Sequence, residues 1–152
     1  MATVYLGLGT NLGNKEATLR TAIYKLQERI GKQVSLSSFY ETAPWGFESD
    51  HSFLNAAIGL ETSLSPIEIL HITQEIEKEL GRTKKSVNGS YSDRLIDIDI
   101  LLYDTLVLQT PELTIPHPLM TERDFVMKPL IEIAENVIHP TREKTLSELY
   151  KE

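Results

Sequence analysis

The sequence contains no cysteine, which excludes a disulfide framework and any metal site built from thiolates. It also lacks an apolar run of the roughly 18 to 20 residues that a bilayer-spanning helix needs. Positive charge is in deficit, because 22 acidic residues outnumber 15 Lys and Arg and leave a net charge of −7. The basic residues are scattered, so we expect no nucleic-acid partner held through its phosphates. Together these absences predict a cytoplasmic protein with no membrane partner.

The size of the chain limits its organisation. Its 152 residues, of which 41% are hydrophobic, suffice for one substantial core but not for two of ordinary size. No long Gly, Pro or Ser tract marks a linker, and no internal repeat is visible. We therefore expect one domain over residues 1–152, acting as a monomer or a weak homodimer.

Hydrophobic periodicity and turn residues predict an alternation of strands and helices. The expected elements are a strand at 2–9, a helix at 14–31, strands at 33–42 and 52–63, a helix at 66–80 and a strand at 94–104. Ser65, Pro66 and Glu68 form a capping-box pattern that begins the second helix. Gly31 and Gly81 stand where helix C-terminal caps belong. The order βαββαβ is the split βαβ arrangement of ferredoxin-like α+β folds.

The C-terminal third is predicted to be less regular. Residues 106–109 can pair back as a hairpin, and short helices are expected after it. Pro116, Pro118, Pro129 and Pro140 are expected to interrupt these helices. The predicted fold is thus a ferredoxin-like core with a C-terminal hairpin and short helices, arranged in αβα layers.

The glycines of "GLGTNLG" (7–13) could suggest a nucleotide-binding loop. Their spacing is G-x-G-x-x-x-G rather than G-x-G-x-x-G, and no Lys-Ser or Lys-Thr pair completes a phosphate loop. We therefore interpret them as a tight strand-to-helix turn that requires glycine's conformational freedom.

The segment "RLIDIDILLYD" (94–104) carries two acids within a strand-like run. Alternation puts Asp97 and Asp99 on one face and three isoleucines on the other. A half-exposed strand with a polar outer face would also explain this pattern. However, Leu95 and Leu101 make the acidic face partly apolar, and carboxylates about 7 Å apart repel each other unless a cation lies between them. Mg²⁺ takes carboxylate oxygens and keeps substrate phosphates in its remaining positions, so the pair indicates a metal site.

Basic residues near this strand suit phosphates. Arg82 and Arg94 flank the polar stretch 83–93, and guanidinium groups match phosphate oxygens. His117, fixed between two prolines, is a candidate hydrogen-bond donor to phosphate or a candidate proton carrier. Taken singly, each of these residues is better explained as an ordinary surface or structural group, and the phosphate-binding interpretation depends on the cluster.

Two residues at the start of the third strand suit a planar heterocycle. Phe53 offers an aromatic face, although core packing would also explain it. Asn55 offers an amide that donates and accepts hydrogen bonds at one place.

Six segments together resemble one enzyme family over essentially the whole chain. They are "GLGTNLG", "ETAPWG", "FLNAA", "ELGR", "DRLIDIDILLYD" and "IPHPLMTERDFVMKPL". The family is 6-hydroxymethyl-7,8-dihydropterin pyrophosphokinase, which acts in folate biosynthesis. The resemblance implies a ferredoxin-like fold and Mg²⁺-dependent transfer of the terminal diphosphate of ATP to the pterin's hydroxymethyl group, which leaves AMP.

The resemblance also implies roles for individual residues. Asp97 and Asp99 would hold two Mg²⁺ ions and act in catalysis with Arg82 and Arg94. The implied ATP site comprises Glu77, Arg82, Lys84, Arg94, Ile100, His117 and Arg123. The implied pterin site comprises Thr42, Trp45, Phe53, Asn55 and Phe125, with the ring lying between the two phenylalanines.

The chain departs from the family pattern in three places. Thr10 replaces the usual serine, and Phe53 stands where tyrosine is common. The stretch 83–93, which closes over the substrates in the family, is longer here and lacks its usual tryptophan. Tyr91 is a candidate to stack in the tryptophan's place.

Two other classes of function would fit parts of the pattern. A ferredoxin-like domain can bind a ligand without chemistry, as a regulatory module does. A metal-dependent enzyme could instead transfer a nucleotidyl group or hydrolyse a phosphate. Dependence on Mg²⁺ and the identity of the products would distinguish these alternatives.

Overall fold

The computed structural model of the chain describes residues 1–11, 13–42, 52–81 and 96–151. The strands are β1 (Ala2–Thr10), β2 (Lys32–Leu36), β3 (Tyr40–Thr42), β4 (Phe53–Thr62), β5 (Asp97–Tyr103), β6 (Leu108–Gln109) and β7 (Thr114–Ile115). The helices are α1 (Lys15–Arg29), α2 (Pro66–Glu79), the 3-10 turn η2 (Met120–Glu122), α3 (Asp124–Ala134) and α4 (Leu146–Lys151).

The main sheet is antiparallel and has the strand order β2-β4-β1-β5, with β3 paired to another part of β4. This order, with α1 and α2 as the two connections, is the ferredoxin-like arrangement that the sequence predicts. Strand β5 therefore lies at one edge of the sheet, and β1 lies in its centre.

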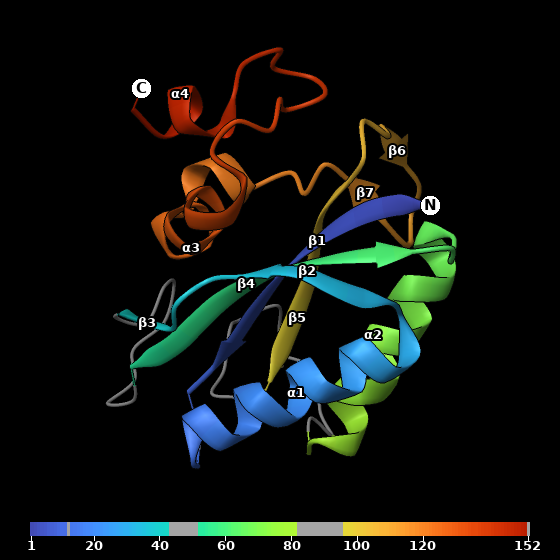
Figure 1. Cartoon of the computed structure of the whole chain (residues 1–152), viewed down its shortest axis with the longest axis vertical. Coiled ribbons are helices and arrows are strands. Elements are labelled where there is room, and N and C mark those ends of the chain that lie inside the picture. The colour runs from blue at the N-terminus through green and yellow to red at the C-terminus, as the bar shows by residue number, and fades with distance from the viewer. Residues whose placement is uncertain (12, 43–51, 82–95, 152) are drawn as a thin grey trace.

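Helices cover both faces of the sheet (Figure 1). The apolar sides of α1 and α2 pack on one face, where the core contains Leu19, Leu26, Ile69 and Ile76. On the other face α3 and α4 form a second cluster with residues of β4 and β5. Full burial stabilises each such Leu or Ile by about 1.5–3 kcal/mol relative to exposure. The sheet is thus held from both sides, as the predicted αβα layers require.

The signals at the ends of α2 are confirmed. The Ser65 hydroxyl accepts a hydrogen bond from the Glu68 amide at 3.3 Å, and the Glu68 carboxylate accepts one from the Ser65 amide at 3.0 Å. A cap of this kind contributes about 1 kcal/mol. Gly81 has a φ of 105°, which favours glycine after the helix.

Gly31, which follows α1, is required for a different reason from the one expected. A Cβ atom at Gly31 would lie 1.9 Å from the Glu61 carbonyl oxygen of β4. The end of α1 and strand β4 are therefore in backbone contact, and no side chain fits between them.

Three details differ from the sequence-based expectations. The predicted strand at 33–42 is broken into β2 and β3, because Ser37 leaves the regular ladder and exchanges hydrogen bonds with Ala57. Pro129 does not interrupt its helix, since it lies inside continuous α3 and is buried in the second cluster. A proline removes one backbone hydrogen bond, and here the packing of α3 offsets that loss.

The C-terminal hairpin forms, but between β6 and β7 rather than against β5. Its turn surrounds Pro111, where the Thr110 amide and hydroxyl both donate to the Leu113 carbonyl at 3.0 Å. The proline-containing turn thus pairs 108–109 with the segment that follows it. No helix in the described part of the chain is long and apolar enough to span a membrane.

An ion-pair cluster joins α1 to α2. The Arg29 guanidinium donates two hydrogen bonds to the Glu79 carboxylate at 2.6 and 2.7 Å, and Lys25 donates a third at 2.9 Å. The Arg29 and Lys25 hydrogen bonds lower the pKa of Glu79 from its ordinary 4.5 to about 2. An arginine that donates two hydrogen bonds to one carboxylate interacts with it more strongly than the partners of a single surface ion pair do.

This cluster should make stability depend on pH. A carboxyl group with a lowered pKa stabilises the fold fully above its unfolded value near 4.5, and that contribution disappears as the pH falls toward about 2. We therefore expect Glu79→Gln to lower the urea midpoint at pH 7, with the difference from the parent shrinking between pH 4.5 and 2. Glu112→Gln, in the β6–β7 turn, is the matched control and should leave the midpoint unchanged. An equal deficit for Glu79→Gln at all pH values would contradict the assignment.

Candidate functional site

Two glycines of β1 lie opposite the acidic pair of β5. In the sheet Gly9 pairs with Asp97, and Gly7 pairs with Asp99. Neither glycine projects a side chain, and neighbouring side chains take the place: Leu101 lies against Gly7, and Asn55 and Phe53 lie against Gly9. The glycines of "GLGTNLG" are therefore strand residues at positions 7 and 9, and only Gly13, with a φ of 67°, serves the turn.

The predicted alternation along β5 is confirmed. Ile96, Ile98 and Ile100 are buried in the main core, whereas Asp97 and Asp99 are half-buried. A register shift opposite Tyr5 and Leu6 of β1 inserts Leu101 as an extra residue, so that Leu101 and Leu102 both join the second cluster. The bulge ends the alternation after the two acids.

A cavity of about 440 Å³ lies at the edge of the sheet beside β5. We call it the edge cavity. It is lined by Leu70, Thr73, Gln74, Glu77, Asp97, Ile98, Asp99, His117, Leu119 and Arg123. Its walls thus come from α2, from β5 and from the segment between β7 and α3. Its volume is in the range of small-molecule binding sites.

Glu77 ties α2 to the edge strand. Its carboxylate accepts a hydrogen bond from the Ile98 amide at 2.8 Å, and the side chain is 8% exposed. An edge strand presents backbone groups that lack a neighbouring strand, so the carboxylate takes the place of one. Glu77 therefore helps to fix Asp97 and Asp99, which flank Ile98, at the mouth of the cavity.

His117 and Arg123 supply hydrogen-bond donors to the opposite wall, and Arg123 also supplies a positive charge. Burial lowers the pKa of His117, nearby Arg123 lowers it further, and Asp97 acts in the opposite direction. The Leu119 amide donates to Nδ1 of His117 at 3.3 Å, which leaves the ring hydrogen on Nε2 when the imidazole is neutral. At pH 7 His117 is therefore a neutral hydrogen-bond donor.

Arg123 is held by its surroundings. Only 6% of the residue is exposed, and its guanidinium lies 5.8 Å from the centre of the Phe125 ring. This distance permits a cation–π attraction. The fixed charge of Arg123 is thus presented to the same cavity as the two aspartates.

The donor set fits Mg²⁺. Two carboxylates on one strand face supply hard oxygen ligands, and the open space beside them leaves positions for water or phosphate. Across the residues that the structure describes, no three His, Asp or Glu side chains gather as a potential metal site. Within the described part of the chain, Asp97 and Asp99 are thus the carboxylates that would hold such an ion, and Mg²⁺ commonly takes substrate phosphates in its other positions.

A second group of predicted residues meets on β3 and β4, across β1 from Asp97. The Asn55 amide donates to the Thr42 hydroxyl at 2.6 Å, and Asn55 pairs with Gly9 across the sheet. A Cβ atom on Gly9 would lie 2.9 Å from the Asn55 side-chain oxygen and 3.7 Å from Phe53. Asn55, Gly9 and Asp97 thus form one cross-strand row, about 10 Å from end to end.

A bridge that sequence reasoning missed anchors β3 to α3. The Glu132 carboxylate accepts hydrogen bonds from the Ser38 amide at 3.0 Å, from the Ser38 hydroxyl at 3.1 Å and from the Tyr40 hydroxyl. The Tyr40 hydrogen bond is the main cause of a lowered Glu132 pKa. More than 90 residues separate the partners, so no local pattern could have revealed the bridge.

Several predicted site residues lie outside the described part of the chain: Trp45, Arg82, Lys84, Tyr91 and Arg94. Ile100 is described, but it is buried in the main core and does not line the edge cavity. Phe125 packs against the second cluster beside Arg123. A pterin ring between Phe53 and Phe125 stays a prediction.

Comparison with known proteins gives a consistent result. Residues 5–135 match the sequence model of the family described as 7,8-dihydro-6-hydroxymethylpterin-pyrophosphokinase (HPPK). A Porphyromonas gingivalis protein named 2-amino-4-hydroxy-6-hydroxymethyldihydropteridine pyrophosphokinase is 56% identical over 141 residues, which are 92% of this chain and 95% of that protein. The protein of the same name from Aquifex aeolicus is 45% identical over 152 residues, 100% of this chain and 92% of that one.

A solved structure supports the fold. The wild-type HPPK-DHPS of Plasmodium falciparum matches 99% of this chain with a TM-score of 0.79 at 17% identity. At this identity the likeness concerns the fold alone, and this chain spans 44% of that protein's chain.

The role of Glu77 can be tested through stability. Glu77→Ala leaves the buried Ile98 amide without this acceptor, and we expect a loss of about 1–3 kcal/mol in the free energy of unfolding, measured in urea. Gln74→Ala is the control, because Gln74 lines the same cavity one turn earlier but is exposed. Equal stabilities for the two variants would show that the Glu77 hydrogen bond does not stabilise the edge.

Proposed function

This chain belongs to the 7,8-dihydro-6-hydroxymethylpterin-pyrophosphokinase family, and we propose that it transfers diphosphate from ATP to 6-hydroxymethyl-7,8-dihydropterin in a Mg²⁺-dependent reaction. It is an enzyme, a diphosphotransferase of folate biosynthesis. The observation that carries the detailed proposal is that Asp97, Asp99, His117 and Arg123 all line the edge cavity. Asn55 of β4 lies nearby, separated from Asp97 of β5 by the single strand β1.

We propose that ATP occupies the edge cavity with its phosphates toward the two aspartates. Asp97 and Asp99 would hold two Mg²⁺ ions, which supply positive charge to the transferred phosphates when bound. Arg123 would neutralise phosphate oxygens with a guanidinium that its burial has already fixed in place. His117 would donate a hydrogen bond from Nε2. Arg82, Arg94 and Lys84 stay predictions for the same phosphates, and Ile100 for the nucleotide.

The reaction requires one bond to form and one to break. The hydroxymethyl oxygen of the pterin attacks the β-phosphorus, and the bond from that phosphorus to the oxygen of the α-phosphate breaks, which releases AMP. The hydroxyl proton would pass to the carboxylate of Asp97. Because phosphoryl transfer depends mostly on positioning and charge neutralisation, the fixed carboxylates and Arg123 suit it.

The pterin would lie on the cross-strand row beside Asn55. Thr42 accepts from the Asn55 amide nitrogen, so the orientation of the amide is set and its oxygen is left to accept from a heterocycle. The absence of a side chain at Gly9 lets the Asn55 amide keep this position, because a Cβ atom there would lie 2.9 Å from the Asn55 oxygen. A heterocycle beside Asn55 would then lie about 10 Å or less from Asp97, within the span of one small substrate.

The first experiment mixes purified protein with ATP, Mg²⁺ and 6-hydroxymethyl-7,8-dihydropterin and measures AMP with and without the pterin. Pterin-dependent AMP is the expected outcome. Release of ADP or free diphosphate would indicate phosphohydrolysis or nucleotidyl transfer instead. Ligand binding without Mg²⁺ and without turnover would indicate a regulatory module.

The acidic pair should be essential to that activity. We expect Asp97→Asn and Asp99→Asn each to lower kcat by about 10²–10³-fold, the usual effect of removing one preorganised electrostatic group. Circular dichroism should show a retained fold, because both side chains are half-buried and outside the apolar core. Asp104→Asn, in the turn after β5, serves as a control on the same segment. Near-parental rates in either Asp97→Asn or Asp99→Asn would refute the metal-binding role.

Removing the Glu132 bridge should raise the KM for the pterin but not the KM for ATP. Glu132→Ala releases Ser38 and Tyr40, and Tyr40 pairs with Asn55 in the sheet, so we expect the KM for the pterin to rise about five- to tenfold. The KM for ATP should stay within twofold, because the edge cavity shares no residue with the bridge. Glu135→Ala, just after the same helix, is the control. Equal changes in both KM values would argue for general loosening of the fold instead.

A further inference from the structure

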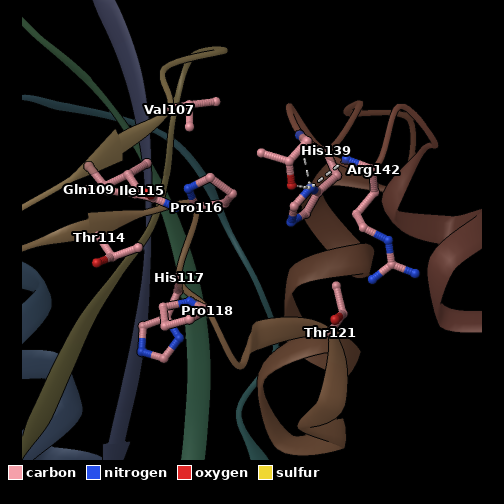
Figure 2. A pocket seen from close by; sticks show the side chains of 11 residues that line it. Val107, Gln109, Thr114, Ile115, Pro116, His117, Pro118, Thr121, His139 and Arg142 are labelled. Carbon is pink, nitrogen blue, oxygen red and sulfur yellow. Dashed lines mark hydrogen bonds between the residues drawn. The ribbon is translucent and has the colours of Figure 1, made fainter.

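A second cavity, of about 210 Å³, lies between the β6–β7 hairpin and the loop His139–Arg142. We call it the hairpin pocket. Figure 2 shows its two walls: the hairpin and the Pro116–Pro118 segment on one side, and the loop with η2 on the other. The lining includes Val107, His117, Thr121, His139 and Arg142. None of the described residues that line the pocket is acidic, although the chain has seven more acidic than basic residues.

His139 supplies a hydrogen-bond donor of fixed orientation to this pocket. Its Nδ1 accepts hydrogen bonds from the Thr141 amide at 3.3 Å and the Arg142 amide at 3.2 Å. Backbone amides can only donate, so Nδ1 is unprotonated and the ring hydrogen of a neutral His139 is on Nε2. Figure 2 shows the Nε2 side of the ring facing the space between the two walls. The residue is only 5% exposed, which means that its orientation is fixed by the loop.

The same wall adds a charge and a hydroxyl. Arg142 and Thr121 line the pocket beside His139, from the loop and from η2 respectively. Burial lowers the pKa of His139, and Arg142 lowers it further, so the imidazole is neutral at pH 7 and the positive charge belongs to the guanidinium. A neutral N–H, a hydroxyl and a guanidinium are all hydrogen-bond donors, and they suit an acceptor that carries negative charge.

We propose that the hairpin pocket binds a small oxyanion, a carboxylate or phosphate group, through His139 Nε2, Thr121 and Arg142. The prolines and Val107 of the opposite wall would pack against the rest of a small ligand. His117 lines both this pocket and the edge cavity, so an oxyanion here would sit behind the segment that faces ATP in the proposed reaction. Binding to the hairpin pocket does not depend on that reaction.

The test is an NMR titration of the full chain, labelled with ¹⁵N, with sodium phosphate and separately with sodium acetate, against sodium chloride at equal ionic strength. We expect saturable shifts of the Thr121, Thr141 and Arg142 amides with at least one of the two oxyanions. The His139 ring should keep its hydrogen on Nε2 throughout, as read from the ring nitrogen shifts. Phosphate bound at the edge cavity would be recognised separately by shifts at Asp97 and Asp99.

Variants separate a specific site from general attraction. Arg142→Gln should weaken the oxyanion about tenfold, and Thr121→Val should weaken it several-fold. Lys144→Gln removes the same charge from an exposed residue of the neighbouring turn that does not line the pocket. The affinity of this variant for the oxyanion should match that of the parent. Shifts that only follow ionic strength, or equal losses in Arg142→Gln and Lys144→Gln, would overturn the proposal.

Discussion

The register of β1 between its two neighbours is the constraint on which the candidate site depends. Backbone hydrogen bonds align Asn55, Gly9 and Asp97 in one row and leave the central position without a side chain. A shift of one residue would turn every side chain of β1 to the opposite face, which would put apolar side chains beside the acidic pair and remove them from the main core. The apolar residues of β1 in the main core, Val4, Leu6 and Leu8, therefore fix the geometry of the site as well as the stability of the fold.

The edge position of β5 gives the acids their access. A central strand would have neighbours on both sides, whereas β5 is covered on its outer side by Glu77 of α2 and by the His117 amide, which donates to the Leu101 carbonyl at 3.0 Å. These contacts satisfy backbone groups of the edge and leave space between them. The edge cavity thus arises where helix and loop replace a missing strand.

Local patterns in the sequence predicted much of this arrangement. The alternation of acids and isoleucines in β5 and the capping box of α2 are encoded within a few residues, so both could be read without a structure. The roles of Gly7 and Gly9 could not, because they depend on what lies across the strand. The same holds for the Glu132 bridge and for Gly31, whose partners are distant in the sequence. The single domain over residues 1–152, the cytoplasmic location and the monomeric or weakly dimeric state stay predictions.

Gly9 has a consequence for inhibitor resistance. Side chains around a binding site can usually be exchanged one at a time, and each exchange offers a route by which an enzyme escapes a competitive inhibitor. At position 9 even a methyl group would press on the Asn55 oxygen, and Asn55 would be displaced together with the inhibitor. If the row binds the pterin as proposed, an inhibitor that rests on the backbone of Gly9 would therefore contact a part of it that mutation cannot reshape without also displacing Asn55.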